Sequence, residues 1–473
     1  MDRPTRAYPP MFETHPYLVR DYSDRRSAIG KVPLPGDPSF SEPLARKRII
    51  GQKAKREDKQ GQQWYEDLHL DWRPGSVRSW VQKFGEYLDK ESLTKQYNPK
   101  GHILKEAQSL REIGDGSKGF VGYIYVDGNN MGKYIQKIRT PEEYMQFSEH
   151  ISQATEYAVY RALAQHLNPR YLKDLNDPET EGRQNIYIHP FEILFIGGDD
   201  VLLIVPADKA LEIAQTIGTE FEKQLLAFDP KRYADDQLPD PDKPVHRYLK
   251  SSVNPPARQC KLSTSLGVLI TADATPIYYA EKLTEQLLKS AKDRAKRLKT
   301  DGYLGGTVDF QVMKSVTMIS SDITSFREQG LTKKGHPTLK LYAAPYTLCE
   351  LGGLLETVKA FKQSEFPRSQ LYQIRSLLEQ GKRLAMLNYR YFRVRLKLGQ
   401  QTLLKEHFEE AWCEAKTNQG NLAPWIFVPP EPDSSKDSCY ETIWRELVDL
   451  YPFVKELDPK AQSEAAPAAQ EGA

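Results

Sequence analysis

Three aspartates stand at the ends of apolar stretches of the sequence. Asp127 follows the run GYIYV, and Asp199 and Asp200 lie between EILFIGG and VLLIVP. These runs have the β-branched and aromatic residues of buried strands, with glycines at the turn. If the strands are neighbours in one sheet, three carboxylates meet at one end of it. Two unit charges about 4 Å apart repel by roughly 4 kcal/mol at an effective dielectric constant of 20, so such a cluster needs cations.

The ligand type indicates which cations these are. Carboxylate oxygens without a neighbouring His or Cys favour Mg²⁺ or Mn²⁺ over Zn²⁺. Two such ions roughly 3.5–4 Å apart can activate an attacking hydroxyl and stabilise a leaving pyrophosphate. We therefore predict a nucleotidyltransferase in which Asp127, Asp199 and Asp200 are the catalytic residues and the ligands of two Mg²⁺ or Mn²⁺ ions, without zinc.

Residues suited to holding phosphate groups surround these aspartates. Glycines at 197 and 198 allow positive φ and close approach of a triphosphate. The segment GNNMG after Asp127 opens a short helix whose free N–H groups can hold phosphate oxygens. A lysine in KSAKDRAK supplies a counter-charge, with a second lysine one turn later. The predicted nucleotide-binding residues are Gly128, Asn129, Asn130, Gly132, Gly197, Gly198, Lys292 and Lys296.

Each of these features also has a purely structural interpretation. GGDD by itself is compatible with an ordinary hairpin turn, and a lysine on an amphipathic helix is usually solvated. His189 and His246 lie in no ligand pattern, so both are predicted to be structural. Cys260 is predicted to be a small buried side chain and not a nucleophile.

The elements that must position the aspartates alternate between strand and helix patterns. Their order, βαββαβα with mixed strand polarity, predicts an α+β palm (ferredoxin-like, nucleotide-cyclase type), with helices on one face of a mixed or antiparallel sheet. The predicted strands are 119–126, 185–196, 201–206, 262–271 and 306–313, and the predicted helices are 140–167, 207–228 and 276–299.

Changes in composition along the chain predict its domains. Residues 1–115 are a basic, Trp-containing docking or linker segment, with Val77, Trp80, Phe84 and Leu88 on one face of a helix. The palm covers residues 116–315 and contains a Pro- and Asp-rich surface insertion at 228–259. Residues 316–456 form a helical C-terminal domain, and the tail 457–473 is disordered.

The overall composition excludes several protein classes. Of 473 residues, 39% are hydrophobic and 27% are charged, which is typical of a soluble globular protein. No apolar run approaches the roughly 20 residues that a membrane span needs. The four cysteines are scattered and form no CxxC pair, which argues against a zinc ribbon or disulfide framework and favours the cytoplasm.

At the residues described above, the chain resembles the large polymerase/cyclase subunit of type III CRISPR effector complexes, of the Cmr (III-B) type. The resemblance rests on YVDGNNMG, FIGGDDVLLIVPADKAL, STSLGVLIT and LLKSAKDRAKRLK. The stretch PYTLCELGGLLETVKAFKQSEFPRSQLYQIRSLLEQG resembles that family's C-terminal helical domain. Together these motifs cover residues 116 to 400, and at most to 456.

The resemblance implies a palm that condenses ATP into cyclic oligoadenylate in antiviral defence, when target RNA pairs with guide RNA. It implies that Asp127, Asp199 and Asp200 hold the metal ions, and that the 128–132 loop with Gly197 and Gly198 holds phosphates. Catalysis would consist mainly of positioning and charge neutralisation. The implied partners are other type III effector subunits and, through the complex, guide RNA and target RNA, without a membrane.

The chain also departs from the family pattern. It has no His-Asp dipeptide of an HD nuclease, no cysteine cluster for zinc, and 115 residues before the palm. It therefore resembles the second palm and the C-terminal domain of the family, as a split subunit or a stand-alone relative. Because two palms together form the nucleotide pocket in that family, synthesis here is expected to need a separate chain carrying the missing half, or self-association.

Two other functions fit parts of the sequence. A diguanylate cyclase also carries a GG[DE]EF hairpin, but here the motif is GGDDV, and both the RxxD signature and the FDxxxFKxxND pattern are missing. A non-catalytic scaffold subunit of a CRISPR ribonucleoprotein fits the missing half, whereas the intact trio of aspartates argues against it.

Overall fold

The computed structural model describes residues 19–21, 26–28, 30–31, 39–47, 79–173, 183, 185–235, 245–252, 258–314, 322–364, 366–413, 422–428 and 438–454. The chain forms two compact units, of which the first comprises residues 1–112 and 169–189 and the second residues 113–168 and 190–473. Val77 and the tail predicted to be disordered lie outside the described residues. No helix in the described ranges is long and apolar enough to cross a membrane.

The first unit contains the helix predicted around Trp80. α2 (Trp80–Lys90) begins at a capping box in which Ser79 and Gln82 exchange side-chain-to-backbone hydrogen bonds. Phe84 and Leu88 are buried, which confirms that part of the predicted face. The other elements of this unit are α3 (Thr94–Tyr97), the pair β1 (Gly30–Lys31) and β2 (Ser39–Phe40), and the sheet β3 (Leu104–Glu106), β6 (Ile186–His189) and β5 (Arg170–Leu172).

The prediction of one continuous strand over residues 185–196 is wrong. β6 ends at His189 and pairs with β3 and β5, whereas β7 (Glu192–Gly197) belongs to a sheet of the second unit. Pro190 stands between them and has no N–H to donate to a ladder. His189 is buried with Nδ1 2.9 Å from Tyr97 Oη, and burial lowers the pKa of its imidazole to about 4, as befits a structural side chain.

The second unit is built on a six-stranded sheet in the order β15-β12-β11-β4-β8-β7. β11 and β12 are parallel, and the other neighbours are antiparallel. The predicted α+β palm with a mixed sheet is therefore confirmed. Besides β7, its strands are β4 (Phe120–Asn129), β8 (Asp200–Pro206), β11 (Ser263–Ala272), β12 (Thr307–Val312) and β15 (Tyr346–Thr347).

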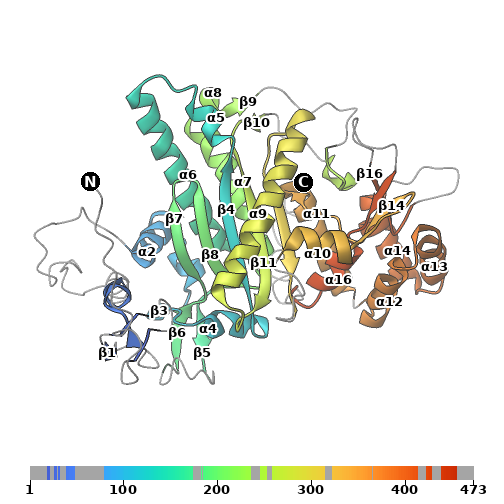
Figure 1. The fold of residues 1–473 in the computed structure, drawn as a ribbon, viewed down its shortest axis with the longest axis horizontal. Helices are drawn as coiled ribbons and strands as arrows, with labels where there is room; N and C mark the ends of the chain where they lie inside the picture. The colour runs from blue at the N-terminus through green and yellow to red at the C-terminus, as the bar shows by residue number, and fades with distance from the viewer. Residues whose placement is uncertain are drawn as a thin grey trace, which may run out of the picture. The chain divides into compact units, whose positions relative to one another are not determined.

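The helices of the palm lie on both faces of the sheet, so the prediction that they share one face is wrong. A Cβ added to Gly122 of β4 would lie 2.4 Å from Ala210 of α7, and one added to Gly267 of β11 would lie 2.3 Å from a backbone oxygen of α9. Gly122 pairs with Ile270 of β11, so these two residues face the same side of the sheet. Ile270 and Gly267 are an odd number of residues apart on β11 and face opposite sides, because successive side chains alternate. Gly122 and Gly267 therefore face opposite sides of the sheet. Figure 1 shows α9 in front of β4 and β11, and α7 behind them.

These helices begin and end close to the predicted positions. α6 starts at Pro141 after Thr140, whose hydroxyl accepts a hydrogen bond from the Glu143 N–H. The helices of the palm are α5 (Met131–Ile135), α6 (Pro141–His166), α7 (Ala210–Phe228), α8 (Pro230–Tyr233) and α9 (Ile277–Thr300), and α4 (Leu110–Gly114) with the 3₁₀ turn Asp115–Ser117 precedes β4.

Part of the predicted surface insertion is buried. The guanidinium of Arg247 forms ion pairs with Glu350 at 2.9 Å and with Glu441 at 2.8 Å, and its side chain is 11% exposed. The interpretation of residues 228–259 as a surface segment is therefore wrong for this stretch. The insertion also contains β9 (Ala234–Asp235), which pairs with β10 (Gln259–Cys260), and the 3₁₀ turn Leu249–Ser252. Cys260 is buried, as predicted.

The C-terminal region combines helices with a small sheet that the sequence did not reveal. Within the predicted helical domain 316–456, α12 and α13 are separated at Gly381, whose φ of +97° interrupts the helix. The elements are α10 (Ile323–Gly330), α11 (Leu348–Gln363), α12 (Arg368–Leu378), α13 (Lys382–Val394), α14 (Leu398–Leu404), the π-turn Lys405–Glu409, α15 (Glu410–Trp412) and α16 (Trp444–Leu450), with the sheet β13 (Thr332–Lys333), β14 (Thr338–Lys340), β17 (Cys439–Glu441) and β16 (Ile426–Val428).

Candidate nucleotide-binding and metal site

Two of the predicted aspartates lie side by side on adjacent strands of the palm. Val126 of β4 pairs with Val201 of β8, and the same register places Asp127 opposite Asp200. Side chains that are opposite each other on antiparallel strands project from the same face, with Cβ atoms about 4.5–5.5 Å apart. The two carboxylates therefore form a pair on the face that α9 covers.

Asp199 occupies the turn between β7 and β8 and is directed differently. Gly197 pairs with Asp200, so the turn consists of Gly198 and Asp199 alone. Gly198 has a φ of +65°, which a type II′ hairpin turn requires at its first position and which glycine adopts without strain. A Cβ added to Gly128 would lie 2.4 Å from the Asp199 carboxylate, so Asp199 lies against the Gly128 backbone. Gly128 and Asp127 face opposite sides of β4.

Burial and nearby negative charge raise the pKa values of the two aspartates of the GGDD motif. Burial raises the pKa of the Asp199 carboxyl, and the charge of Asp127 adds to this rise, while hydrogen bonds from backbone N–H groups oppose it. Burial also raises the pKa of Asp200, with further contributions from Asp127 and Asp199. Lys292 lowers both pKa values. Asp127, Asp199 and Asp200 therefore form an acidic corner of the sheet, and the cations of the protein itself neutralise this corner incompletely.

Lysines on one face of α9 approach this corner. The Lys292 ammonium donates a hydrogen bond to the Asp127 carboxylate and forms an ion pair with it. Lys296 lies one turn later and pairs with Asp293 at 3.2 Å on an exposed surface. Lys299 lies a further turn along and donates to Asn130 Oδ1 at 2.9 Å. A row of cations thus extends along α9 from the aspartates.

The loop after Asp127 has a defined structure. The side chain of Asn129 donates to Ser263 Oγ at 3.1 Å and accepts from Ser265 Oγ at 2.9 Å, so its amide holds β4 to β11. Asn130 adopts a left-handed conformation with a φ of +65° and begins α5. A Cβ atom added to Gly132 or to Gly197 would have no other atom within 4 Å.

A cavity of about 120 Å³ lies between this loop and α9. Five of the predicted nucleotide-binding residues line it, together with Ser263, Lys299 and Tyr303, which the sequence reasoning missed. Lys299 follows Lys292 by seven residues, so helical periodicity could have identified it. The predicted residues that line the cavity are Gly128, Asn129, Asn130, Lys292 and Lys296, whereas Gly132, Gly197 and Gly198 do not line it.

The donor chemistry of this corner fits a divalent cation, although the carboxylates do not converge on one point. Within the described residues, no group of three or more His, Cys, Asp or Glu side chains is arranged to hold a metal ion. Asp127 is directed to Lys292, and Asp199 is directed to Gly128. Asp127 and Asp200 place carboxylate oxygens on the same face of the sheet, and oxygen is the donor type that Mg²⁺ and Mn²⁺ prefer.

Comparison with known protein families identifies the palm. Residues 120–300 match the family model of Cas10/Cmr2, second palm domain. This part of the chain is therefore similar to the Cas10/Cmr2 second palm. The match runs from β4 to the end of α9 and includes all the predicted site residues. It confirms the resemblance to the large subunit of type III CRISPR effectors, but it does not distinguish the Cmr branch from the others. No curated protein sequence matches the chain.

Solved structures of Csm1 are similar to parts of the chain. A Csm1–Csm4 cassette in complex with cA4 has 15% identity and a TM-score of 0.26, over 41% of this chain and 23% of that one. Csm1 from T. onnurineus has 14% identity and a TM-score of 0.36, over 64% and 36%. A Csm1–Csm4 cassette in complex with cA3 has 13% identity and a TM-score of 0.36, over 71% and 36%. The chain therefore spans about a quarter to a third of these proteins.

Proposed function

We propose that this Cas10/Cmr2 palm is a metal-dependent nucleotidyltransferase that condenses ATP into cyclic oligoadenylate in type III CRISPR defence. The observation that carries the proposal is the pairing of Asp127 with Asp200 on adjacent strands, beside a cavity lined by Lys292 and Lys296. Paired carboxylates next to a cationic cavity suit a triphosphate with its divalent cations. The family match at residues 120–300 supports this assignment.

The residues of the chain have distinct tasks in this proposal. Asp127, Asp199 and Asp200 would hold Mg²⁺ or Mn²⁺, which when bound neutralises the phosphates and the attacking oxygen. Lys292 and Lys296 would bind the triphosphate oxygens and orient the α-phosphate toward the aspartates. The backbone N–H groups at 129–130 would contact the same phosphates from the other wall of the cavity, whereas the Gly128 N–H is bonded to Asp199. Catalysis then depends on position and charge, which the sheet and α9 hold in place.

We further infer that synthesis takes place in an assembly. The chain matches 36% of the length of two Csm1 structures, and we propose that the nucleotide pocket is completed within the assembly, by a separate chain or a second copy. The inferred partners are other type III effector subunits, together with guide RNA and target RNA through the complex. An association with Csm4-like subunits is suggested by the cassettes named above.

The test is product formation by the full chain with its partners and cognate RNA. Replacing Asp199→Ala together with Asp200→Ala is expected to reduce oligoadenylate synthesis by about three orders of magnitude, because both carboxylates would be lost from the metal site. Supplying ATP and GTP separately distinguishes an oligoadenylate synthase from a diguanylate cyclase. Undiminished synthesis by the folded double variant would contradict the proposal.

The scaffold alternative has a specific outcome of its own. The ion pair between Lys292 and Asp127 neutralises one carboxylate without a metal, as a non-catalytic palm would require. A scaffold would support complex assembly equally well with and without the two aspartates, and would make no nucleotide product in either case.

A further inference from the structure

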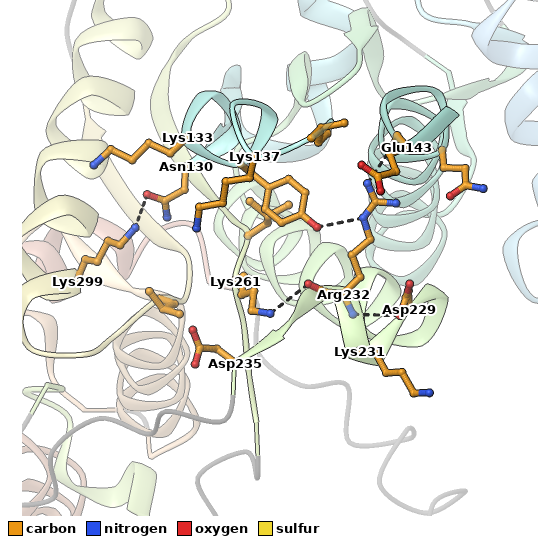
Figure 2. A pocket seen from close by; sticks show the side chains of 15 residues that line it. Asn130, Lys133, Lys137, Glu143, Asp229, Lys231, Arg232, Asp235, Lys261 and Lys299 are labelled. Atoms are coloured by element: carbon orange, nitrogen blue, oxygen red, sulfur yellow. Dashed lines mark hydrogen bonds between the residues drawn. The ribbon is translucent and has the colours of Figure 1, made fainter. Parts of the chain in front are cut away.

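A second and larger cavity adjoins the one beside the aspartates. It has a volume of about 810 Å³, within the range of about 300–1,000 Å³ that is typical of ligand pockets. The two cavities share Asn130, Lys299 and Leu304 as lining residues, so they adjoin each other at the end of α9. Figure 2 shows the larger cavity, referred to below as the basic cavity, whose lining residues come from α5, α6, α8, β9, α9 and neighbouring loops.

Positive charge predominates on its walls. The acidic residues are partly engaged with the backbone: Asp229 accepts from the Arg232 N–H at 3.0 Å, and Glu143 accepts from the Arg139 N–H at 3.1 Å. Arg232 is held by Tyr134 Oη at 3.0 Å. The basic lining residues are Lys133, Lys137, Lys231, Arg232, Lys261 and Lys299, and the acidic ones are Glu143, Asp229 and Asp235.

Three of the lysines gather where the two cavities join. Burial lowers the pKa of the Lys299 ammonium, and the charges of Lys133 and Lys137 lower it further. Within the described residues, Lys133 and Lys137 form no ion pair with a carboxylate. Like charges that repel each other around a cavity are stabilised when a multivalent anion binds between them. The junction is therefore built for an anion with more than one charge.

The direction of α9 indicates where this anion comes from. Lys292, Lys296 and Lys299 follow at intervals of four and three residues, so they lie on one face and span about 10 Å at a rise of 1.5 Å per residue. With the α-phosphate of ATP at the aspartates, as the proposed function has it, the β- and γ-phosphates would extend along this row toward Lys299. The leaving group of the reaction is consequently formed at the entrance to the basic cavity.

We propose that the basic cavity binds the inorganic pyrophosphate released by nucleotidyl transfer, at a site separate from that of the triphosphate. In the transfer, a 3′-oxygen bonds to the α-phosphorus, the bond from the α-phosphorus to the α–β bridging oxygen breaks, and its electron pair leaves with pyrophosphate. The hydroxyl proton passes to solvent. Lys133, Lys137 and Lys299 then bind the pyrophosphate oxygens. This inference rests on the proposed function, because the direction of the triphosphate follows from it.

The experiment is calorimetric titration of the full chain with inorganic pyrophosphate, ATP and orthophosphate, each with Mg²⁺. The variant Lys133→Ala plus Lys137→Ala removes two exposed lysines of the basic cavity. Pyrophosphate affinity is expected to fall about tenfold or more, because hydrogen bonds to charged groups are lost, while ATP affinity changes less than about twofold. The matched control, Lys282→Ala plus Lys289→Ala, removes the same charge from exposed positions of α9 that line neither cavity.

Three results would overturn the inference. These are unchanged pyrophosphate affinity in the Lys133 and Lys137 variant, a parallel loss of ATP affinity that would indicate a single shared site, and equal affinity for orthophosphate and pyrophosphate. Because the titration needs no turnover, its result is independent of product formation. If the Asp199 and Asp200 variant keeps full synthesis, the proposed function fails, whereas the assignment of the basic cavity is decided by the two lysines alone.

Discussion

The ammonium of Lys292 in α9 is bonded to the carboxylate of Asp127 in β4, a residue 165 positions earlier in the chain. This contact joins the helix on one face of the palm to the strand that carries the acidic corner. It also places one fixed cation beside Asp127 and Asp200, which face each other across β4 and β8.

Removing the Lys292 charge should make the palm depend on divalent cations. In Lys292→Ala the repulsion between Asp127 and Asp200 is no longer offset, so the free energy of unfolding should fall by about 1 kcal/mol and Mg²⁺ should restore it. Thermal unfolding with and without Mg²⁺ measures this. Lys296→Ala serves as the control because its lysine pairs with exposed Asp293. An equal response of both variants to Mg²⁺ would argue against a cation site at Asp127.

Two glycines of the same loop should respond differently to alanine. In Gly128→Ala the new Cβ would collide with the Asp199 carboxylate, so nucleotide binding should weaken by about tenfold or more through displacement of Asp199. Gly132→Ala adds its Cβ to open space and should change affinity less than about twofold. Mg²⁺-dependent ATP binding checks both, with circular dichroism to verify folding. Similar losses in the two variants would show that the loop, and not the Asp199 contact, decides binding.

Buried Glu446 makes stability depend on pH. Burial raises the pKa of this carboxyl to about 7 from an ordinary 4.5, although Tyr346 Oη at 2.6 Å and backbone N–H groups donate to it. Because the pKa is raised in the folded state, the stabilisation is complete below about pH 4.5 and is lost as the pH rises through about 7. The loss corresponds to about 3 kcal/mol at 1.36 kcal/mol per pKa unit.

Glu446→Gln should remove this dependence. A glutamine can still accept from the Ala344 N–H, so the variant should gain about 3 kcal/mol over the natural protein between pH 5 and pH 8. Urea unfolding at the two pH values measures the difference. A constant difference between the two proteins at both pH values would mean that Glu446 does not titrate in this range.

The ion-pair network around Arg247 should be costly to break. Among the described residues, Arg247→Ala leaves the fully buried Glu350 carboxylate with Arg294, at 3.3 Å, as its one remaining ion-pair partner. The free energy of unfolding should fall by about 3–5 kcal/mol, as is usual when one member of a buried pair is removed. Lys223→Ala is the comparison, because its exposed pair with Glu220 should contribute less than about 1 kcal/mol. Chemical denaturation distinguishes a network that stabilises the fold from one that is neutral.

Local patterns predicted the palm well. Residue-type alternation located β4, β8 and β11, and helical periodicity with Pro141 and Thr140 located α6. The face that each helix covers could not be predicted, because it depends on which strands carry Gly122 and Gly267 and on their register.

The features that local patterns did not predict depend on contacts between residues that are distant in the sequence. The division between β6 and β7 depends on pairing partners in two different sheets. The burial of Arg247 within a polar insertion depends on Glu350 and Glu441, which lie 103 and 194 residues away. At the site, the sequence suggested the acidic corner and Lys292, while the Asp199 contact with Gly128 arises from the geometry of a two-residue turn.

The pairing of Asp127 with Asp200 as a metal site is tested most directly by Mg²⁺-dependent binding of an ATP analogue with a non-hydrolysable α–β bond to the full chain. The variant Asp127→Asn plus Asp200→Asn keeps the shape of both side chains and removes their charge, and Asp293→Asn is the control on the exposed face of α9. Affinity is expected to fall about 100-fold or more in the double variant and to be unchanged in the control. Equal Mg²⁺-dependent affinity in the natural protein and the double variant would contradict it.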